Sequence, residues 1–428
     1  MFSVNWGSWK ILSYSLQIKD FWFQTKQRRI VRVSRASPLP HPFPKWKEVS
    51  TSECQRVAGL FTRYEISTES SSISRMDQHI IARFNDSILH EAMRRYGIAK
   101  DQLKPLDAFE SFIYEFEREG EGFILRIGHS FRKSAAHMQG EVDWINYLAR
   151  YGVSVARAVP SENGNLIEAI DDGQAGQFFV TAFIKAPGQQ PWVAGWTPTR
   201  YENYGRLLGS MHALAVDYQP VPAWRRPEWN DVSLNFIELY LPESEVIAHQ
   251  AYASLMEHIH TLPKDKTSYG LVHQDAHQNN FFIDTDGTLT LFDFDDCAYS
   301  WFINDIAIVL FYISMDAEEL GFKDSASFTH EFLLHFLRGY RQAYTLSPAW
   351  LKEIPTFLKL RELELYAVVH RDFQIDGVEH WSLESFKQIP GFDLNSDGHM
   401  WIANFMKDRK TRIEQGLPFI DYNFEALV

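Results

Sequence analysis

The fold is decided by residues 270–296, which read GLVHQDAHQNNFFIDTDGTLTLFDFDD. Residues 271–272 lead as a short strand into a polar loop, and the apolar runs 281–283 and 289–292 are typical of two further strands. The Asp-Gly pair at 286–287 lies between these two runs and is a strong hairpin signal. The stretch therefore predicts a polar loop followed by a β-hairpin.

Three oxygen-bearing side chains gather at the open end of this hairpin. A turn centred on the Asp-Gly pair places Asn280 directly across from Asp293, and Asp275 projects from the loop beside them. An amide oxygen and a carboxylate suit Mg²⁺, and a further carboxylate suits a base that takes the proton of an alcohol. Phosphoryl transfer needs this combination. Two alternatives stay open here: a metal hydrolase that uses His273, Asp275 and His277 as ligands, and an ordinary polar loop with a hairpin.

Two strands and a helix are predicted on the N-terminal side of this stretch. Residues 112–117 and 122–127 are strand-like on either side of a turn at 118–120. A helix is predicted over 141–151, with Gly152 as its C-terminal stop. These elements predict a small β-rich lobe that precedes the polar loop.

The predicted helix carries an acidic residue on its apolar stripe. Glu141 lies on the same helical face as Ile145 and Leu148. A carboxylate that points at a core is costly unless it has a partner. The nearest cation on a core-directed strand is Arg126, so we expect these two side chains to pair.

A hinge and a helical region follow. Residues 177–183 form a short apolar strand, and the breaker pair Pro187-Gly188 after it suits a hinge between lobes. An amphipathic helix is predicted over 204–214, and the pattern beyond it is mostly helical. The apolar run 306–315 is too short to span a bilayer and predicts a buried helix.

Composition limits the class of protein. Of 428 residues 45% are hydrophobic and only two are cysteines, which fits a globular protein of a reducing compartment and excludes a disulfide framework. The first 75 residues hold 12 Lys or Arg against 5 Asp or Glu, whereas the whole chain has a net charge of −13. A body this acidic argues against nucleic-acid binding. We expect a cytoplasmic protein that is not bound to a membrane, and the sequence gives no indication of its oligomeric state.

The decisive stretch resembles the aminoglycoside phosphotransferase and choline kinase superfamily, in which the catalytic loop reads H-G-D-x-H-x-x-N and the metal segment reads D-F-x-D. It is most similar to uncharacterised bacterial phosphotransferases related to type II homoserine kinases and stress-response kinases. The similarity extends to the segments 108–116, 123–127, 204–212 and 300–307. It covers roughly residues 76–344, so it does not rest on one motif.

The resemblance implies a role for each matching residue. Asp275 would be the catalytic base, and His273 would hold the loop in shape, braced by the buried carboxylate of Asp305. Asn280 and Asp293 would bind Mg²⁺. For the nucleotide, the resemblance implies that Arg126 would bind the phosphates in place of the usual Lys and that Glu141 would orient Arg126. Ser111 would contribute from the first hairpin. Gln274 departs from the family pattern, which has glycine there, and Ala108 and Ser111 replace the usual Gly and Asn.

We therefore predict an α+β, protein-kinase-like two-lobed fold. Residues 1–75 would be a basic, loosely ordered extension, 76–184 the β-rich N-lobe and 185–428 the mostly helical C-lobe. The predicted function is transfer of the γ-phosphoryl of ATP, with Mg²⁺, to a hydroxyl of a small molecule such as an amino alcohol, an amino acid or an aminoglycoside. The alternatives are a protein Ser/Thr kinase and a catalytically idle pseudokinase with a binding role.

Overall fold

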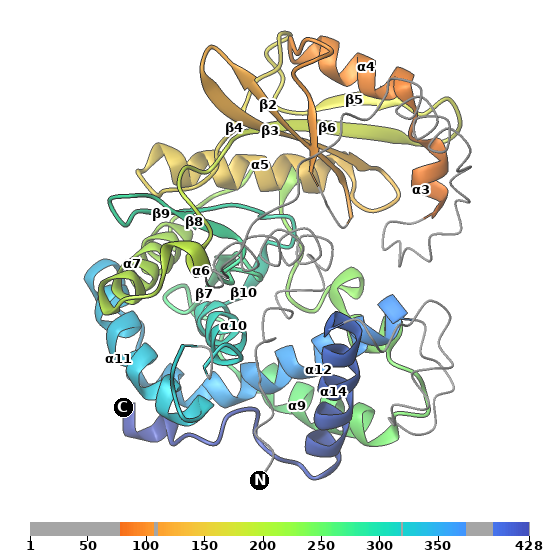
Figure 1. Cartoon of the computed structure of the whole chain (residues 1–428). Helices are drawn as coiled ribbons and strands as arrows, with labels where there is room; N and C mark the ends of the chain where they lie inside the picture. The colour runs from red at the N-terminus through yellow and green to blue at the C-terminus, as the bar shows by residue number, and fades with distance from the viewer. Residues whose placement is uncertain (1–77, 107–109, 318–319, 374–396, 428) are drawn as a thin grey trace, which may run out of the picture.

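A computed structural model describes residues 78–106, 110–317, 320–373 and 397–427. They form two lobes, a smaller one built on a β-sheet and a larger one built mostly of helices (Figure 1). The predicted α+β division into a β-rich and a helical lobe is confirmed. The predicted extension, residues 1–75, lies outside the described residues, and the limits 76–184 and 185–428 stay predictions.

The N-lobe sheet has six antiparallel strands. Its order is β1-β2-β3-β6-β4, and β5 pairs with β6 beside β4. The strands span β1 Lys104–Leu106, β2 Phe112–Arg118, β3 Glu121–His129, β4 Ala158–Val159, β5 Glu168–Asp171 and β6 Gln177–Ile184. The strands predicted at 112–117, 122–127 and 177–183 are thus present with ends within two residues, because the alternation of apolar residues that marks them is local.

Helix α5, Ala135–Arg150, packs beneath this sheet on the side of the C-lobe (Figure 1). It begins six residues before the predicted start at 141, because the Ser134 side chain accepts the N–H of His137 and caps the first turn. Gly152, with φ of 85°, follows the helix as predicted. The short helices α3, Gln78–Arg83, and α4, Asp86–Arg95, cover the opposite face of the sheet.

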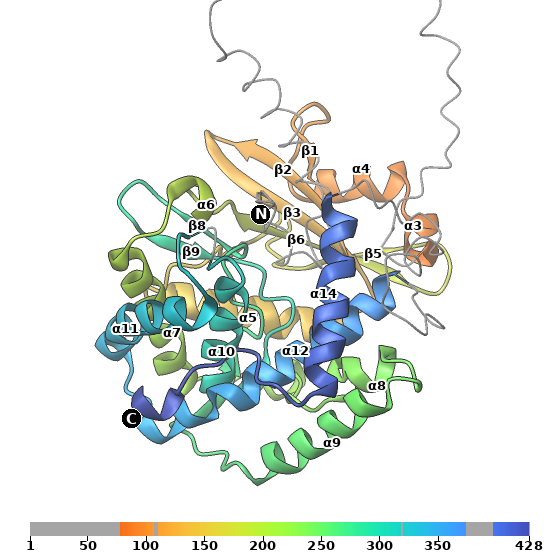
Figure 2. The ribbon, with the colours of Figure 1, turned by 60° about the horizontal axis from the view of Figure 1, so that its bottom comes forward.

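The C-lobe is a bundle of helices. Helices α7 and α11 pack with their backbones in close approach, since a Cβ at Gly205 or Gly339 would meet backbone atoms of the other helix within 2 Å. Helix α12 lies between α10 and α14 (Figure 2). The helices span α6 Pro191–Ala194, α7 Pro198–Ala215, α8 Phe236–Tyr240, α9 Val246–Thr261, α10 Phe302–Ser314, α11 Ser325–Ala343, α12 Ile354–Phe373 and α14 Asp397–Glu414. Short 3-10 turns span η3 Pro222–Trp224, η4 Val232–Leu234, η5 Pro348–Glu353 and η6 Phe424–Leu427.

Helix α10 is the centre of the C-lobe. Every residue from Phe302 to Ser314 is buried, which confirms the helix predicted around 306–315. Its apolar side chains join one core with residues from α7, α11 and α12. Within the described part of the chain, no helix is long and apolar enough to cross a membrane.

The C-lobe also contains two short β-ribbons. β7, Tyr269–Val272, pairs with β10, Ala298–Trp301, and β8, Phe281–Ile283, pairs with β9, Leu289–Leu291. Both ribbons are antiparallel. The polar loop of the decisive stretch lies between β7 and β8.

The register predicted for the β8–β9 hairpin is wrong by one residue. The carbonyl of Asn280 accepts the N–H of Phe292 at 2.8 Å, so Asn280 lies opposite Phe292 and not opposite Asp293. The reason is the turn, which contains three residues, 285–287, and not two. Gly287 takes φ of 87° as the last of the three, an arrangement common in three-residue hairpins.

Candidate active site

A buried carboxylate holds the polar loop in place. Asp305, in the first turn of α10, is fully buried and accepts the backbone N–H of His273 at 2.9 Å and that of Gln274 at 2.8 Å. The Nε2 atom of His212 lies 3.3 Å from the same carboxylate. The contact predicted between Asp305 and the loop is therefore present.

Gln274 adopts the left-handed backbone conformation, with φ of 69°. Glycine, which the family pattern has at this position, reaches that conformation without steric cost, whereas another residue is strained by about 1–2 kcal/mol. Here the side chain has a partner, because its Oε1 accepts from the Nδ2 of Asn304 at 2.6 Å. The loop thus keeps the conformation that glycine would give, despite the altered residue.

His273 has a structural role in this loop. Its ring is fully buried, its Nδ1 accepts the N–H of Asp275 at 3.2 Å, and its Nε2 lies 3.1 Å from the carbonyl oxygen of Phe292. Burial lowers the pKa of His273, so a neutral ring that donates through Nε2 fits both bonds. Because both nitrogens are engaged, His273 is not available as a metal ligand. This removes the main support for the metal hydrolase alternative.

Asp275 is 5% exposed and both of its carboxylate oxygens have partners. Oδ1 accepts from Nη2 of Arg361 at 2.6 Å, whereas Oδ2 lies 3.1 Å from Nδ2 of Asn280 and 3.1 Å from Nε2 of His277. Burial would raise the pKa of Asp275, but His277 and then Arg361 hold it well below its usual range. The carboxylate is therefore ionised and able to accept a hydrogen bond from a hydroxyl in the cleft that it lines.

Asn280 and Asp293 line the same cleft, and each carries an oxygen of the kind that a hard cation prefers. The Nδ2 of Asn280 donates to the Asp275 carbonyl at 2.9 Å, which leaves the amide oxygen for a cation. Burial and then the Asp295 carboxylate raise the pKa of Asp293 to about 7, although Arg126 opposes this. A divalent cation beside Asp293 would offset that cost, so the residues fit Mg²⁺. No three His, Cys, Asp or Glu side chains of the described residues are grouped to hold a metal.

A buried ion pair lies on the N-lobe side of the cleft. Arg126, on β3, donates through Nη2 to Oε2 of Glu141, on α5, at 2.7 Å, and both side chains are at least nine-tenths buried. The pair expected from the helical stripe is therefore present. The planar fork of an arginine can bind two phosphate oxygen atoms at once. Ser111, directly before β2, also lines the cleft.

The cleft between the lobes has a volume of about 450 Å³. Its lining includes the apolar side chains of Ile124, Phe183, Phe282 and Phe292 as well as the polar side chains described above. A cleft of this size with both kinds of side chain suits a molecule with a flat ring and a charged tail.

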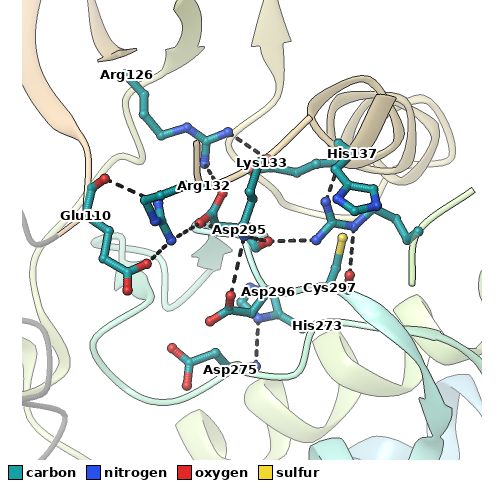
Figure 3. Close-up of polar contacts among 12 residues, drawn as sticks. Glu110, Arg126, Arg132, Lys133, His137, His273, Asp275, Asp295, Asp296 and Cys297 are labelled. Carbon is teal, nitrogen blue, oxygen red and sulfur yellow. Dashed lines mark hydrogen bonds and ion pairs between the residues drawn. The ribbon is translucent and has the colours of Figure 1, made fainter. Parts of the chain in front are cut away.

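Sequence reasoning missed three cationic residues at the site. Arg132 and Lys133 follow β3 and reach Asp295 (Figure 3), and the signal that could have found them is a basic pair between a strand end and the helix cap Ser134. Arg361 lies on α12 and is 86 residues away from Asp275, the carboxylate that it contacts. No local pattern in the sequence marks Arg361.

Comparison with known proteins bears on this geometry. The model of the phosphotransferase enzyme family matches residues 102–354, which is more than half of the chain. This chain belongs to the phosphotransferase enzyme family. The family assignment made from the sequence is confirmed, and so is the prediction of an enzyme that transfers a phosphoryl group to an alcohol. Arg361 lies beyond the matched range.

Two amicoumacin kinases are similar over most of their length. The amicoumacin kinase of Bacillus subtilis (strain 168) is 38% identical over 344 residues, which are 80% of this chain and 96% of the relative. The solved structure of amicoumacin kinase hAmiN, in complex with AMP-PNP, Ca²⁺ and Ami, has a TM-score of 0.73 at 35% identity and covers 82% of this chain and 100% of its own.

A microcompartment-associated aminopropanol kinase has a TM-score of 0.59 at 21% identity, covering 77% of this chain and 97% of its own. This is a likeness of fold. Together with the hAmiN structure it confirms the predicted kinase-like fold.

Proposed function

We propose that this phosphotransferase moves the γ-phosphoryl group of ATP to a hydroxyl of an amine-bearing small molecule, with Mg²⁺ bound by Asn280 and Asp293. The observation that carries the proposal is the ionised carboxylate of Asp275, which lines the same cleft as the Arg126–Glu141 pair and the two oxygen donors. These are the parts that phosphoryl transfer requires.

In the proposed reaction the hydroxyl of the acceptor donates a hydrogen bond to Asp275. The bond between the γ-phosphorus and the bridging oxygen breaks, ADP leaves with the electron pair, and a new bond forms between phosphorus and the acceptor oxygen. The proton of the hydroxyl passes to Asp275 and then to solvent. Positioning does most of the catalysis in such a reaction, which suits a carboxylate fixed by three partners.

The nucleotide and the metal are assigned from the same cleft. The apolar side chains of its lining would take the adenine ring, and Arg126 would bind the phosphates while Glu141 keeps it in place. Mg²⁺ would neutralise the phosphate charge that develops during transfer. The complex of the related hAmiN with AMP-PNP and Ca²⁺ supports a nucleotide and a divalent cation at this site.

The acceptor class rests on two observations. The chain is 38% identical to an amicoumacin kinase over nearly the whole of that relative, so amicoumacin is the first acceptor to test. Burial raises the pKa of Glu364, and the nearby carboxylates of Asp296 and Asp275 add to this, so the negative charge gathered there suits an acceptor that carries a protonated amine.

Two other functions were left open by the sequence, a protein Ser/Thr kinase and an idle pseudokinase. The altered loop residue Gln274 was the best support for an idle enzyme. That support is weakened, because the loop keeps its conformation and its bonds to Asp305. The same loop chemistry would serve a protein kinase. That function is tested by measuring phosphoryl transfer to a hydroxyl of a protein in place of a small molecule.

The test measures ADP release with ATP, Mg²⁺ and either amicoumacin or an amino alcohol such as aminopropanol. We expect release that depends on the acceptor, and a fall of about 10²–10⁴-fold for Asp275→Asn. ATP binding, measured by calorimetry, should remain in that variant because the shape is kept. Asp217→Asn is the matched control, since its carboxylate is exposed and pairs with Lys266. Full turnover of Asp275→Asn would show that Asp275 is not the base.

A further inference from the structure

Three cationic side chains of the N-lobe converge on one carboxylate of the C-lobe. The carboxylate oxygens of Asp295 lie 2.7 Å from Nζ of Lys133, 3.3 Å from Nη2 of Arg132 and 3.6 Å from Nη1 of Arg126. Figure 3 shows Arg126, Arg132 and Lys133 directed at Asp295 from three sides. The Asp295 side chain is 18% exposed and lines the cleft.

The charge around the cleft is unfavourable for a triphosphate. Seven carboxylates and three cationic side chains, Arg126, Arg132 and Lys185, are among its lining residues. The Nζ atom of Lys185 donates to the carboxylate of Glu115 at 2.5 Å. Arg126 and Arg132 also have carboxylate partners, but each carries a guanidinium, whose planar fork can bind two phosphate oxygens at once. Repulsion from the carboxylates makes a second cation valuable for nucleotide binding.

The sequence between β1 and β2, residues 107–111, contains no glycine. Loops that bring backbone N–H groups onto phosphate generally use glycine, because a side chain prevents the close approach. A guanidinium supplied from the loop between β3 and α5 can replace such contacts, and its fork matches the geometry of phosphate oxygens.

From this arrangement we propose that Arg132 is a second phosphate-binding residue of the nucleotide site. In the structure, the Glu110 carboxylate and Asp295 hold Arg132. When a triphosphate binds, Arg132 exchanges these carboxylates for phosphate oxygens, while Lys133 keeps Asp295 in place. This inference rests on the proposed use of ATP and names a residue beyond those that the family resemblance implies.

The side chain of Arg132 is suited to such an exchange. It is 23% exposed and lines the cleft, whereas that of Arg126 is 9% exposed and fixed on Glu141. Glu110, its partner, is also in contact with Arg371 at 3.8 Å, so Glu110 keeps a cation when Arg132 leaves. Arg132 can therefore change partners without leaving a buried charge uncompensated.

The test compares the affinities of ATP, ADP and AMP, each with Mg²⁺, by calorimetry on the full chain. Arg132→Gln should weaken ATP binding about tenfold, a loss of about 1.4 kcal/mol, and should change AMP binding less than about twofold. Arg132→Lys should recover part of the loss. Arg94→Gln is the matched control, because that arginine is 67% exposed on α4 and pairs with Glu91.

A second variant should change the affinity for ATP in the opposite direction. Glu110→Gln removes the carboxylate that competes for Arg132, so ATP should bind more tightly than in the unmodified protein while AMP binding stays the same. If the Glu110–Arg132 pair were only structural, both variants would weaken ATP and AMP alike, and the proposal would be wrong. Equal ATP affinity for the unmodified protein and Arg132→Gln would also overturn it, with the proposed function intact. Absence of ATP binding to the unmodified protein would instead refute the proposed function.

Discussion

At the scale of single residues, the contact that most affects chemistry is the one between Asp275 and Arg361. The Nη2 of Arg361 lies 2.6 Å from Oδ1 of Asp275 and 2.8 Å from the hydroxyl of Tyr312. An arginine held on both sides fixes the carboxylate in one orientation. Small errors in the position of a catalytic group cost up to about 10²-fold in rate. We therefore expect Arg361 to position Asp275, although it lies outside the range that the family model matches.

We expect Arg361→Gln to lower kcat about ten- to a hundredfold, because Asp275 loses the partner that orients it. The KM for ATP should stay within about twofold, since Arg361 is not among the residues that line the cleft. ADP release with amicoumacin or aminopropanol measures both values. Arg338→Gln is the control, because this arginine is 54% exposed and pairs with Glu202 on α7. An unchanged kcat in Arg361→Gln would show that Asp275 is positioned by its other partners.

Gln274 gives a second test at this scale. Gln274→Gly relieves the left-handed strain, whereas Gln274→Ala keeps the strain and, like the glycine variant, loses the bond to Asn304. The glycine variant should therefore be more stable than the alanine variant by about 1 kcal/mol in chemical denaturation. The opposite order would mean that the loop relaxes away from φ of 69° when the side chain is short.

At the scale of elements, the connection between the lobes is held by a β-type contact. The segment after β6 bonds to the end of β8, with Gln189 N–H to Ile283 O at 3.0 Å and Ile283 N–H to Gln189 O at 2.8 Å. Gly188, with φ of 93°, lies against this contact, and a Cβ there would be 2.2 Å from the Ile283 carbonyl oxygen. The predicted breaker pair is thus followed by a contact that ties the end of β6 to the β8–β9 hairpin, which precedes Asp293.

Gly188→Ala should destabilise the protein by about 2 kcal/mol more than Gly173→Ala. Both glycines have positive φ, but a Cβ at Gly173 meets nothing within 4 Å, so that variant reports strain alone. Denaturant unfolding measures the difference. ATP affinity should also fall in Gly188→Ala, because Ala186 and Lys185 line the cleft. Equal losses of stability in the two variants would show that the backbone at Gly188 moves away from that at Ile283 without a cost in free energy of unfolding.

At the scale of the whole molecule, both lobes contribute to one site. Arg126, Glu141 and Arg132 come from the N-lobe, and Asp275, Asn280 and Asp293 come from the C-lobe. A ligand that contacts both lobes stabilises their native arrangement but not the unfolded chain. The stability of the whole chain should therefore report the occupancy of the cleft.

ATP with Mg²⁺ should raise the melting temperature of the full chain, with a stabilisation of about 2.7 kcal/mol when the ligand is at a hundred times its Kd. Asp293→Ala should remove the part of the shift that depends on Mg²⁺, because the carboxylate that would bind the ion is lost. Asp217→Ala should behave as the unmodified protein does. Thermal unfolding with ATP alone, Mg²⁺ alone and both together separates the effects. No shift with both at millimolar concentration would favour an idle protein.

The sequence by itself determined the features that depend on local pattern. Neighbouring residues were enough to predict three features: the alternation that marks β2, β3 and β6, the apolar run of α10, and the place of the polar loop between strands. The partnership of Arg126 with Glu141 could also be predicted, because an acid on an apolar helical stripe must find a cation. The family motif supplied the roles of Asp275, Asn280 and Asp293, which stay proposals.

Only the tertiary structure decided the remaining contacts. The hairpin register was missed by one residue because the letters Asp-Gly do not distinguish a two-residue from a three-residue turn. The positions of Arg361 and Arg132 depend on how α12 and the loop after β3 pack against the cleft. A contact between residues 86 positions apart leaves no mark on the periodicity of either segment. Such contacts are fixed by packing across the whole fold, and the sequence signals used here are local.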